Sequence, residues 1–205
     1  MRTRSAIILL ATASSFALGG CLGKVKYPTF YALQLAPAPP VHTTETATVS
    51  VAVREFRSAE YLRRGAIVFR PSAEEIGFYD YSRWATDPPR TVTNAVVDRL
   101  RASGNFTHVN IYDGHSDIDY VLTGQLERLD EVDFGGAVRV EVALSAQLTA
   151  NRTGKIVWEN SASEVTTVDK RDVPAVVSTM DQAMDEALVK LLSSLPASTV
   201  RKSGL

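Results

Sequence analysis

Alternation of apolar and polar residues predicts the clearest elements of this sequence. From Val138 to Ala150 every second side chain is apolar, and most side chains between them are polar or charged. A period of two predicts a long antiparallel strand with one face in the core and the other in water. The turn at Asn151-Arg152-Thr153-Gly154 predicts a hairpin, with Ile156 to Thr167 as the returning strand.

Shorter strand patterns precede this hairpin and are bounded by turn-forming residues. The segment Ile76–Tyr81 is rich in aromatic residues, and we expect it to pair with Gly65–Phe69 as a hairpin across Pro71 to Glu75. The expected strands are Phe30–Leu35, Val49–Val53, Gly65–Phe69, Ile76–Tyr81, Phe106–Tyr112 and Tyr120–Leu129.

Two segments have the helical period instead. Asp87-Pro88-Pro89 is typical of a helix start, and the following apolar positions recur every four residues until Gly104 ends the pattern. Asp172 and Pro174 predict the start of a second helix, whose apolar stripe continues to Leu195 before Pro196. The order of these strands and helices along the chain predicts an α+β fold: a mainly antiparallel sheet with both helices packed on one face.

The first twenty residues have the pattern of an export signal. Arg2 and Arg4 form a basic start, residues 6–18 are an apolar run, and Leu18-Gly19-Gly20-Cys21 follows. The run is too short to span a bilayer comfortably, and this order of regions is typical of a secretory signal peptide. We expect a signal at 1–20, a tether at 21–29, one domain at 30–196 and a flexible tail at 197–205.

Cys21 ends a sequence that resembles a lipobox, in which the cysteine thiol is acylated and the preceding peptide is removed. It is the only cysteine of the chain, so no internal disulfide can form, and acylation would remove an exposed thiol from an oxidising compartment. Leu22, rather than Asp, follows it. By analogy with enterobacterial sorting, this residue predicts anchoring in the outer membrane.

The charge balance bears on the class of partner. Removal of Arg2 and Arg4 from the 22 basic residues leaves 20 against 23 acidic ones, a net charge of −3 with the N-terminus acylated. This balance argues against nucleic acid as a partner.

Side-chain patterns for catalysis or metal binding are weak. His42, His108 and His115 do not stand at metal-ligand spacing, and an acidic site around His115 is a poorer interpretation than a polar turn. Asp130, Glu131 and Asp133 are interpreted as a solvated hairpin end. We therefore predict no metal, no cofactor and no enzymatic activity.

One segment has the composition of a contact surface. Tyr, Trp and Arg are enriched in interface hot spots, whereas aromatic residues of this kind also build cores. Between Tyr61 and Trp84 they are dense, and the predicted contact residues are Arg63, Arg64, Tyr79, Tyr81, Arg83 and Trp84. Whether this surface meets protein or lipid stays open at this point.

The sequence resembles the PqiC/YmbA-like ABC-type transport auxiliary lipoproteins. The resemblance rests on the lipobox at Cys21, Phe30-Tyr31-Ala32-Leu33, Val49-Ser50-Val51-Ala52-Val53 and above all the block from Tyr61 to Leu100. It continues as a strand and helix pattern to about Leu195. Departures are small: Phe30 stands where Tyr is frequent, and a double proline starts the first helix.

The resemblance implies a function that composition and spacing do not show. It implies a lipoprotein of the outer membrane that faces the periplasm and works with an MCE-domain protein and an inner-membrane ABC permease and ATPase. These systems move lipids or other hydrophobic molecules across the envelope, and a homo-oligomer is also expected. The alternatives are a scaffold lipoprotein of another envelope machine and an envelope hydrolase whose site has no recognisable motif.

Overall fold

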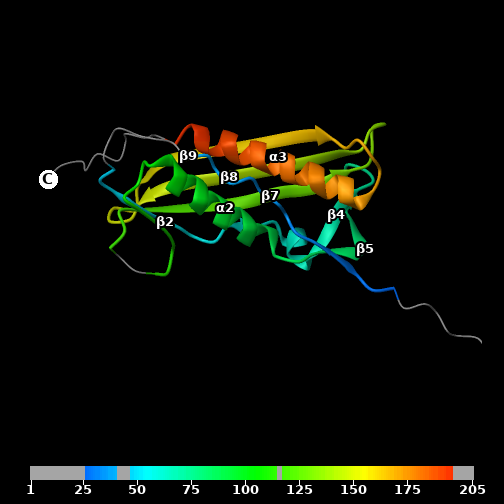
Figure 1. The fold of residues 1–205 in the computed structure, drawn as a ribbon, viewed down its shortest axis with the longest axis horizontal. Helices are drawn as coiled ribbons and strands as arrows, with labels where there is room; N and C mark the ends of the chain where they lie inside the picture. The colour runs from blue at the N-terminus through cyan, green and yellow to red at the C-terminus, as the bar shows by residue number, and fades with distance from the viewer. Residues whose placement is uncertain (1–25, 41–46, 115–116, 196–205) are drawn as a thin grey trace, which may run out of the picture.

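The long strand β7 (Tyr120–Val132) is the centre of a nine-stranded mixed sheet. This computed structural model describes residues 26–40, 47–114 and 117–195 (Figure 1). Along one edge β7 pairs antiparallel with β8 (Arg139–Ala150), which pairs with β9 (Ile156–Thr167). The hairpin predicted from the alternation is therefore confirmed.

Three short strands pair with the other edge of β7, one after another. β2 (Ser50–Val53), β3 (Arg57–Ser58) and β4 (Ala66–Arg70) each run parallel to it. They pair with successive parts of β7: Val51 of β2 lies opposite Tyr120, and Val68 of β4 lies opposite Asp130. β7 therefore fixes the places of β2, β3, β4 and β8, to which the remaining strands attach.

The two ends of β7 carry different extensions of the sheet. At the start of β7, β6 (His108–Ile111) runs parallel to β2. At its end, β5 (Gly77–Trp84) runs antiparallel to β4, as predicted, and β1 (Thr29–Tyr31) runs parallel to β5. Between β3 and β4 lies a short 3₁₀ helix, η1 (Glu60–Arg64).

The prediction of a mainly antiparallel sheet is wrong. β2, β3, β4 and β6 all join the sheet through parallel pairs, and so does β1. Parallel pairing requires a crossover, and the helix between β5 and β6 returns the chain so that β6 enters in the direction of β2. Alternation of apolar and polar residues indicates which face of the sheet each side chain lies on, but it does not indicate the direction of the neighbouring strand.

Both helices lie over the same face of the sheet (Figure 1). α2 (Pro88–Ser103) ends at Gly104, whose φ of 68° is the left-handed cap that glycine favours. α3 (Val173–Ser193) begins after Asp172, whose side chain accepts a hydrogen bond of 2.9 Å from the backbone N of Ala175. The predicted starts of both helices are confirmed.

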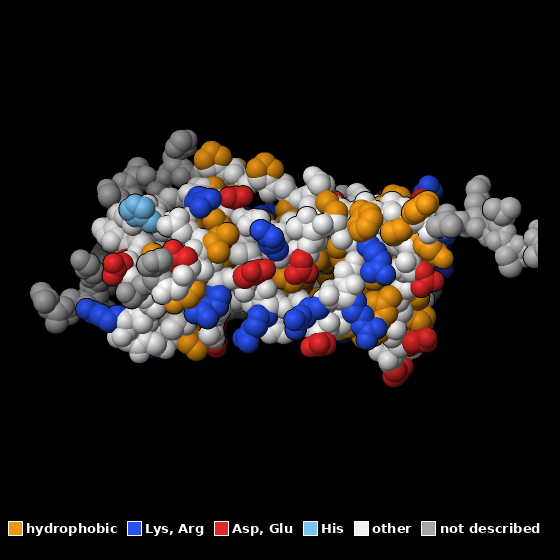
Figure 2. Space-filling model, turned by 90° about the horizontal axis from the view of Figure 1, so that it is seen from below, with side chains coloured by type: hydrophobic (Ala, Val, Ile, Leu, Met, Phe, Trp, Pro, Cys, Tyr) orange, Lys and Arg blue, Asp and Glu red, His pale blue; other side chains and the backbone are white. Residues whose placement is uncertain are grey.

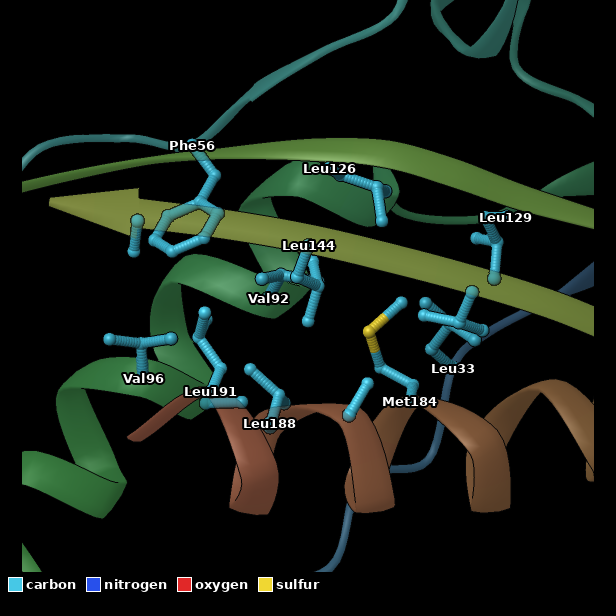
Figure 3. Packing of buried hydrophobic residues seen from close by; sticks show 14 of the residues in the cluster. Leu33, Phe56, Val92, Val96, Leu126, Leu129, Leu144, Met184, Leu188 and Leu191 are labelled. Carbon is cyan, nitrogen blue, oxygen red and sulfur yellow. The ribbon is translucent and has the colours of Figure 1, made fainter. Parts of the chain in front are cut away.

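The core fills the space between these helices and the sheet (Figure 3). Leu126 of β7 and Leu144 of β8 point at Met184 and Leu188 of α3, and all four side chains are fully buried. Burial of this kind contributes roughly 1.5–3 kcal/mol per side chain. The core therefore fixes α3 over the long hairpin.

Candidate functional site

The structure separates the six predicted contact residues. Arg63 and Arg64 are exposed on η1, and Tyr81 and Arg83 are exposed on β5. Trp84 is only 7% exposed and belongs to the core, and Tyr79 is half-buried. Contact with a partner stays a prediction, and the surface available for it consists of the four exposed side chains.

Tyr79 has an internal hydrogen-bond partner. Its hydroxyl donates to Glu131 Oε2 at 2.7 Å, and its ring lies 5.1 Å from that of Phe69. Burial raises the pKa of Tyr79 and also that of Glu131. The Tyr79 side chain therefore links β5 to the central strand β7.

An aromatic and basic surface surrounds the first described residues. Tyr27, Phe30 and Tyr81 are 79%, 61% and 42% exposed, and Lys26 Nζ lies 4.3 Å from the centre of the Tyr81 ring. Pairing of β1 with β5 places Phe30 opposite Arg83. We call Lys26, Tyr27, Phe30, Tyr81 and Arg83 the anchor-proximal patch. The sequence interpretation counted Lys26 and Tyr27 as tether, although aromatic and basic residues following a lipobox were a signal.

Figure 2 shows hydrophobic, basic and acidic side chains interleaved at the end of the molecule where the described chain begins. Two further arginines belong to this end. Arg64 lies 4.8 Å from the centre of the Phe78 ring, and Arg63 lies 3.9 Å from Glu60, its neighbour on η1. Cation–π contacts of this kind hold a guanidinium near the surface while leaving it open to solvent.

A buried carboxylate lies where β4 joins β7. Asp130 is completely buried, and its Oδ2 accepts hydrogen bonds from Arg70 Nε at 2.6 Å and from the Tyr61 hydroxyl at 3.2 Å. Arg128 Nε lies 3.7 Å from the same oxygen. Burial, followed by the Asp130 charge, raises the pKa of Tyr61 to about 12.

The interpretation of Asp130 and Glu131 as part of a solvated hairpin end is wrong. Both residues lie inside β7, where they are 0% and 5% exposed, whereas Asp133 beyond the strand is exposed. Their partners come from β4, β5 and η1, far away in the sequence. These polar bonds join the patch-bearing end of the sheet to the central strand.

An N-terminal strap, residues 32–37, leaves β1 and crosses the junction of the two helices (Figure 1). The backbone N of Gln34 donates to Asp181 Oδ1 at 3.0 Å, and that of Ala36 donates to Asp185 Oδ2 at 2.9 Å. The side chain of Leu33, within the strap, is buried in the core. The strap therefore fixes the chain that follows the tether onto the folded domain.

The candidates for metal binding are not brought together. His108 is exposed, whereas His42, His115 and Cys21 lie outside the described residues. Asp119, an acidic residue close to His115 in the sequence, accepts hydrogen bonds from the backbone N and the hydroxyl of Ser50. Within the described ranges, no three His, Cys, Asp or Glu side chains form a group that could hold a metal ion.

A shallow polar groove crosses the middle of β7, β8 and β9. Cross-strand pairing places Thr123 beside Gln147 and Gln147 beside Glu159, and Arg57 lies at one margin. Its lining combines hydroxyl and amide side chains with the Glu159 carboxylate and the Arg57 guanidinium.

The described features are those of an α+β domain with a buried polar network and an exposed aromatic and basic patch at one end. A family model for the ABC-type transport auxiliary lipoprotein component matches residues 31–191, and the chain belongs to this family. The family description names an auxiliary component of transport, and the chain is accordingly a lipid-anchored envelope protein associated with a transport system. No described helix has the length and apolarity to cross a membrane. No curated protein matches the chain.

Two of the solved structures with a similar fold match this chain over most of its length. Protein XCC0632 from Xanthomonas campestris has a TM-score of 0.69 at 20% identity, covering 80% of this chain and 92% of that one. An uncharacterized protein has a TM-score of 0.64 at 14% identity, covering 83% of this chain and 99% of that one. At these identities the likeness shows the fold alone.

Removal of Arg70 is expected to destabilise the domain strongly. Arg70→Ala leaves Asp130 buried without its closest cation, and we expect the free energy of unfolding to fall by about 3 kcal/mol in urea denaturation. Arg63→Ala breaks only an exposed ion pair and should cost less than about 1 kcal/mol. Equal small losses in the two variants would contradict this account of the buried network.

The strap predicts a pH dependence of stability. Burial, and then the nearby Asp185 charge, raise the pKa of Asp181 to about 6 from a usual value of 3.8. The folded state therefore binds more protons than the unfolded state between these values, so this residue's contribution to stability falls as pH rises through them. Asp181→Asn keeps an acceptor oxygen for Gln34 and should raise stability at pH 7.5 by about 1 kcal/mol, because the site is partly solvated.

The same Asp181→Asn substitution should give almost no gain at pH 4, where the wild-type carboxyl is already protonated. Thermal unfolding at both pH values measures the difference. Asp98→Asn on the exposed face of α2 is the matched control. A gain that is the same at both pH values would contradict the assignment to the Asp181 carboxyl.

Proposed function

We propose that this protein is an outer-membrane lipoprotein facing the periplasm, and a non-catalytic auxiliary component of an MCE and ABC-type system that transports lipids or other hydrophobic molecules. The observation that supports this most is the family match over residues 31–191. The auxiliary protein contacts the MCE-domain protein, whose permease and ATPase lie in the inner membrane. Its contribution is docking, so it needs no catalytic residue.

The anchor is an acylated Cys21, with the signal at 1–20 removed. Acyl chains contribute about 0.8 kcal/mol per buried CH₂, so multiple chains hold the domain firmly on a bilayer. The domain at 30–196 then stands on the membrane through its tether at 21–29. The tail at 197–205 lies at the other end of the chain and takes no part in this proposal.

Cys21→Ser tests the anchor. Without the thiol no thioether forms, so the variant should leave the membrane fraction and fail to incorporate a radioactive fatty acid in the cell. Cell fractionation and acyl labelling give the two readouts. Labelling of the Cys21→Ser chain at the level of the unchanged protein would place the lipid elsewhere.

Arg63 and Arg64 are the proposed contact with the transport partner. Both are exposed, both lie on one short helix, and η1 covers the buried Asp130 network through Tyr61. Arginine supplies a charged and planar contact group that is enriched at interface hot spots. A second copy of the chain could contact the same surface, because ring-forming partners favour symmetric docking.

Crosslinking in cells, followed by purification and mass spectrometry, tests the proposed partners. We expect recovery of an MCE-domain protein with its permease and ATPase. Arg63→Glu/Arg64→Glu should reduce that recovery at least about tenfold, as expected for a loss of hot-spot contacts. Arg90→Glu/Arg152→Glu changes two exposed arginines elsewhere and should leave recovery unchanged.

The identity of the recovered proteins distinguishes the proposed functions. A different envelope complex, without an MCE-domain protein, would support the scaffold alternative. Unchanged recovery with Arg63→Glu/Arg64→Glu, in a variant that still folds, would show that η1 is not the contact.

A further inference from the structure

We propose that the anchor-proximal patch rests directly on the membrane surface and binds an anionic phospholipid bilayer. The proposal deepens the proposed function, since the acylated Cys21 brings the patch to the membrane. It assigns Tyr81 and Arg83 to lipid and leaves Arg63 and Arg64 to the transport partner. The lipid anchor would hold the protein, and the patch would orient it.

The length of chain between the anchor and the domain limits where the domain can stand. Only residues 22–25 separate Cys21 from Lys26, the first described residue. Consecutive residues span at most about 3.6 Å each, so the Cα atoms of Cys21 and Lys26 are at most about 18 Å apart. The surface around Lys26 is therefore held within reach of the lipid headgroups.

The side chains at that place are those that suit a membrane interface. Aromatic rings with exposed faces concentrate at the level of the headgroups, and basic residues are attracted by anionic lipids. Tyr27, Phe30 and Tyr81 supply the rings, and Lys26 and Arg83 supply the charge. Asp80 of β5 is the exposed acidic residue next to Tyr81, and it reduces this positive charge without cancelling it.

Three residues of the anchor-proximal patch, Phe30, Tyr81 and Arg83, belong to paired strands of the sheet. β1 pairs with β5 over three residues, and the backbone N of Ala85 donates a hydrogen bond of 2.7 Å to the backbone carbonyl oxygen of Tyr31. The half-buried Tyr31 packs against the core. Phe30 and Tyr81 are therefore presented together on a rigid surface, so their contact with lipid would fix the tilt of the whole domain.

Other exposed apolar residues lack this context. Ile111 of β6 and Ile156 of β9 are 52% and 46% exposed, and both lie on strands that begin or end near the start of β7. Isolated exposed apolar residues are normal on soluble domains. These two isoleucines are therefore suitable controls, because they match the patch in exposure but lie at the other end of the molecule.

Sedimentation with lipid vesicles tests the proposal without the anchor. The probe is the chain from residue 21 with Cys21→Ser, which keeps every described residue, mixed with phosphatidylglycerol/phosphatidylethanolamine vesicles. We expect this protein to partition onto the vesicles. Phe30→Asp/Tyr81→Asp should lower its partition coefficient at least about tenfold, because two rings lose their place in the interface, whereas Ile111→Asp/Ile156→Asp should not change it.

Lys26→Glu/Arg83→Glu provides a second measurement that keeps the aromatic residues. It should lower binding to the anionic vesicles about tenfold or more, an effect that 0.5 M salt removes, because each basic residue near an anionic surface contributes roughly a fivefold factor. Phosphatidylcholine vesicles should show no such difference between the charge variant and its parent. Circular dichroism checks that each variant folds.

Several outcomes would overturn the membrane contact. Absence of binding to anionic vesicles would do so, and so would equal binding of the parent and both patch variants. A patch variant that changes the oligomeric state in light scattering, with partition unchanged, would assign the patch to contacts between protein chains. None of these outcomes depends on acylation of Cys21 or on the transport partner. The membrane contact and the proposed function are therefore tested independently.

Discussion

The pairing of β7 along both of its edges is the constraint on which the structure depends. One edge is covered by β8 along its length, and the other receives β2, β3 and β4 in succession. A strand enclosed in this way is buried enough to hide Asp130 completely, and the carboxylate then requires the Arg70 guanidinium and the Tyr61 hydroxyl. Those two contacts hold η1 and β4 against the strand, so the same interaction also fixes the exposed arginines of η1.

Because β7 is long, the molecule has two distinct ends. From Val121 to Glu131 the strand rises about 30 Å at roughly 3.3 Å per residue. β2 and β6 lie near its start, whereas β4, β5 and β1 lie near its end (Figure 1). The N-terminal chain enters at the second end, where aromatic and basic side chains gather (Figure 2). One end thus combines the patch and η1, while the strap that follows β1 hydrogen-bonds to α3 and lies beside α2. In the proposed function, a domain built in this way would hold its partner at a defined distance and orientation relative to the bilayer.

The sequence predicted the elements of this fold better than their arrangement. Alternation identified β8, the turn after it identified β9, and prolines with aspartates identified the starts of both helices, because these signals are local. The direction of β2, β3 and β4 is not local, since it is set by the β7 edge that each strand joins. Asp130 was misinterpreted because its partners lie 60 and 69 residues away in sequence. The burial of Trp84 beside the exposed Arg83 does follow a period of two, so that part of the contact surface could have been refined from the sequence.

The orientation of the anchored domain is tested most directly by thiol labelling of the acylated protein inserted into vesicles from outside. Acylated Cys21 has no free thiol and is the only cysteine, so Tyr81→Cys and Ile111→Cys each introduce one reactive group. Labelling rates with a membrane-impermeant maleimide are compared with those of the same variants carrying Cys21→Ser in solution. The account predicts that vesicles slow the labelling of position 81 at least about tenfold and leave position 111 unchanged. Equal rates at position 81 in the two settings, or protection of position 111 instead, would contradict it.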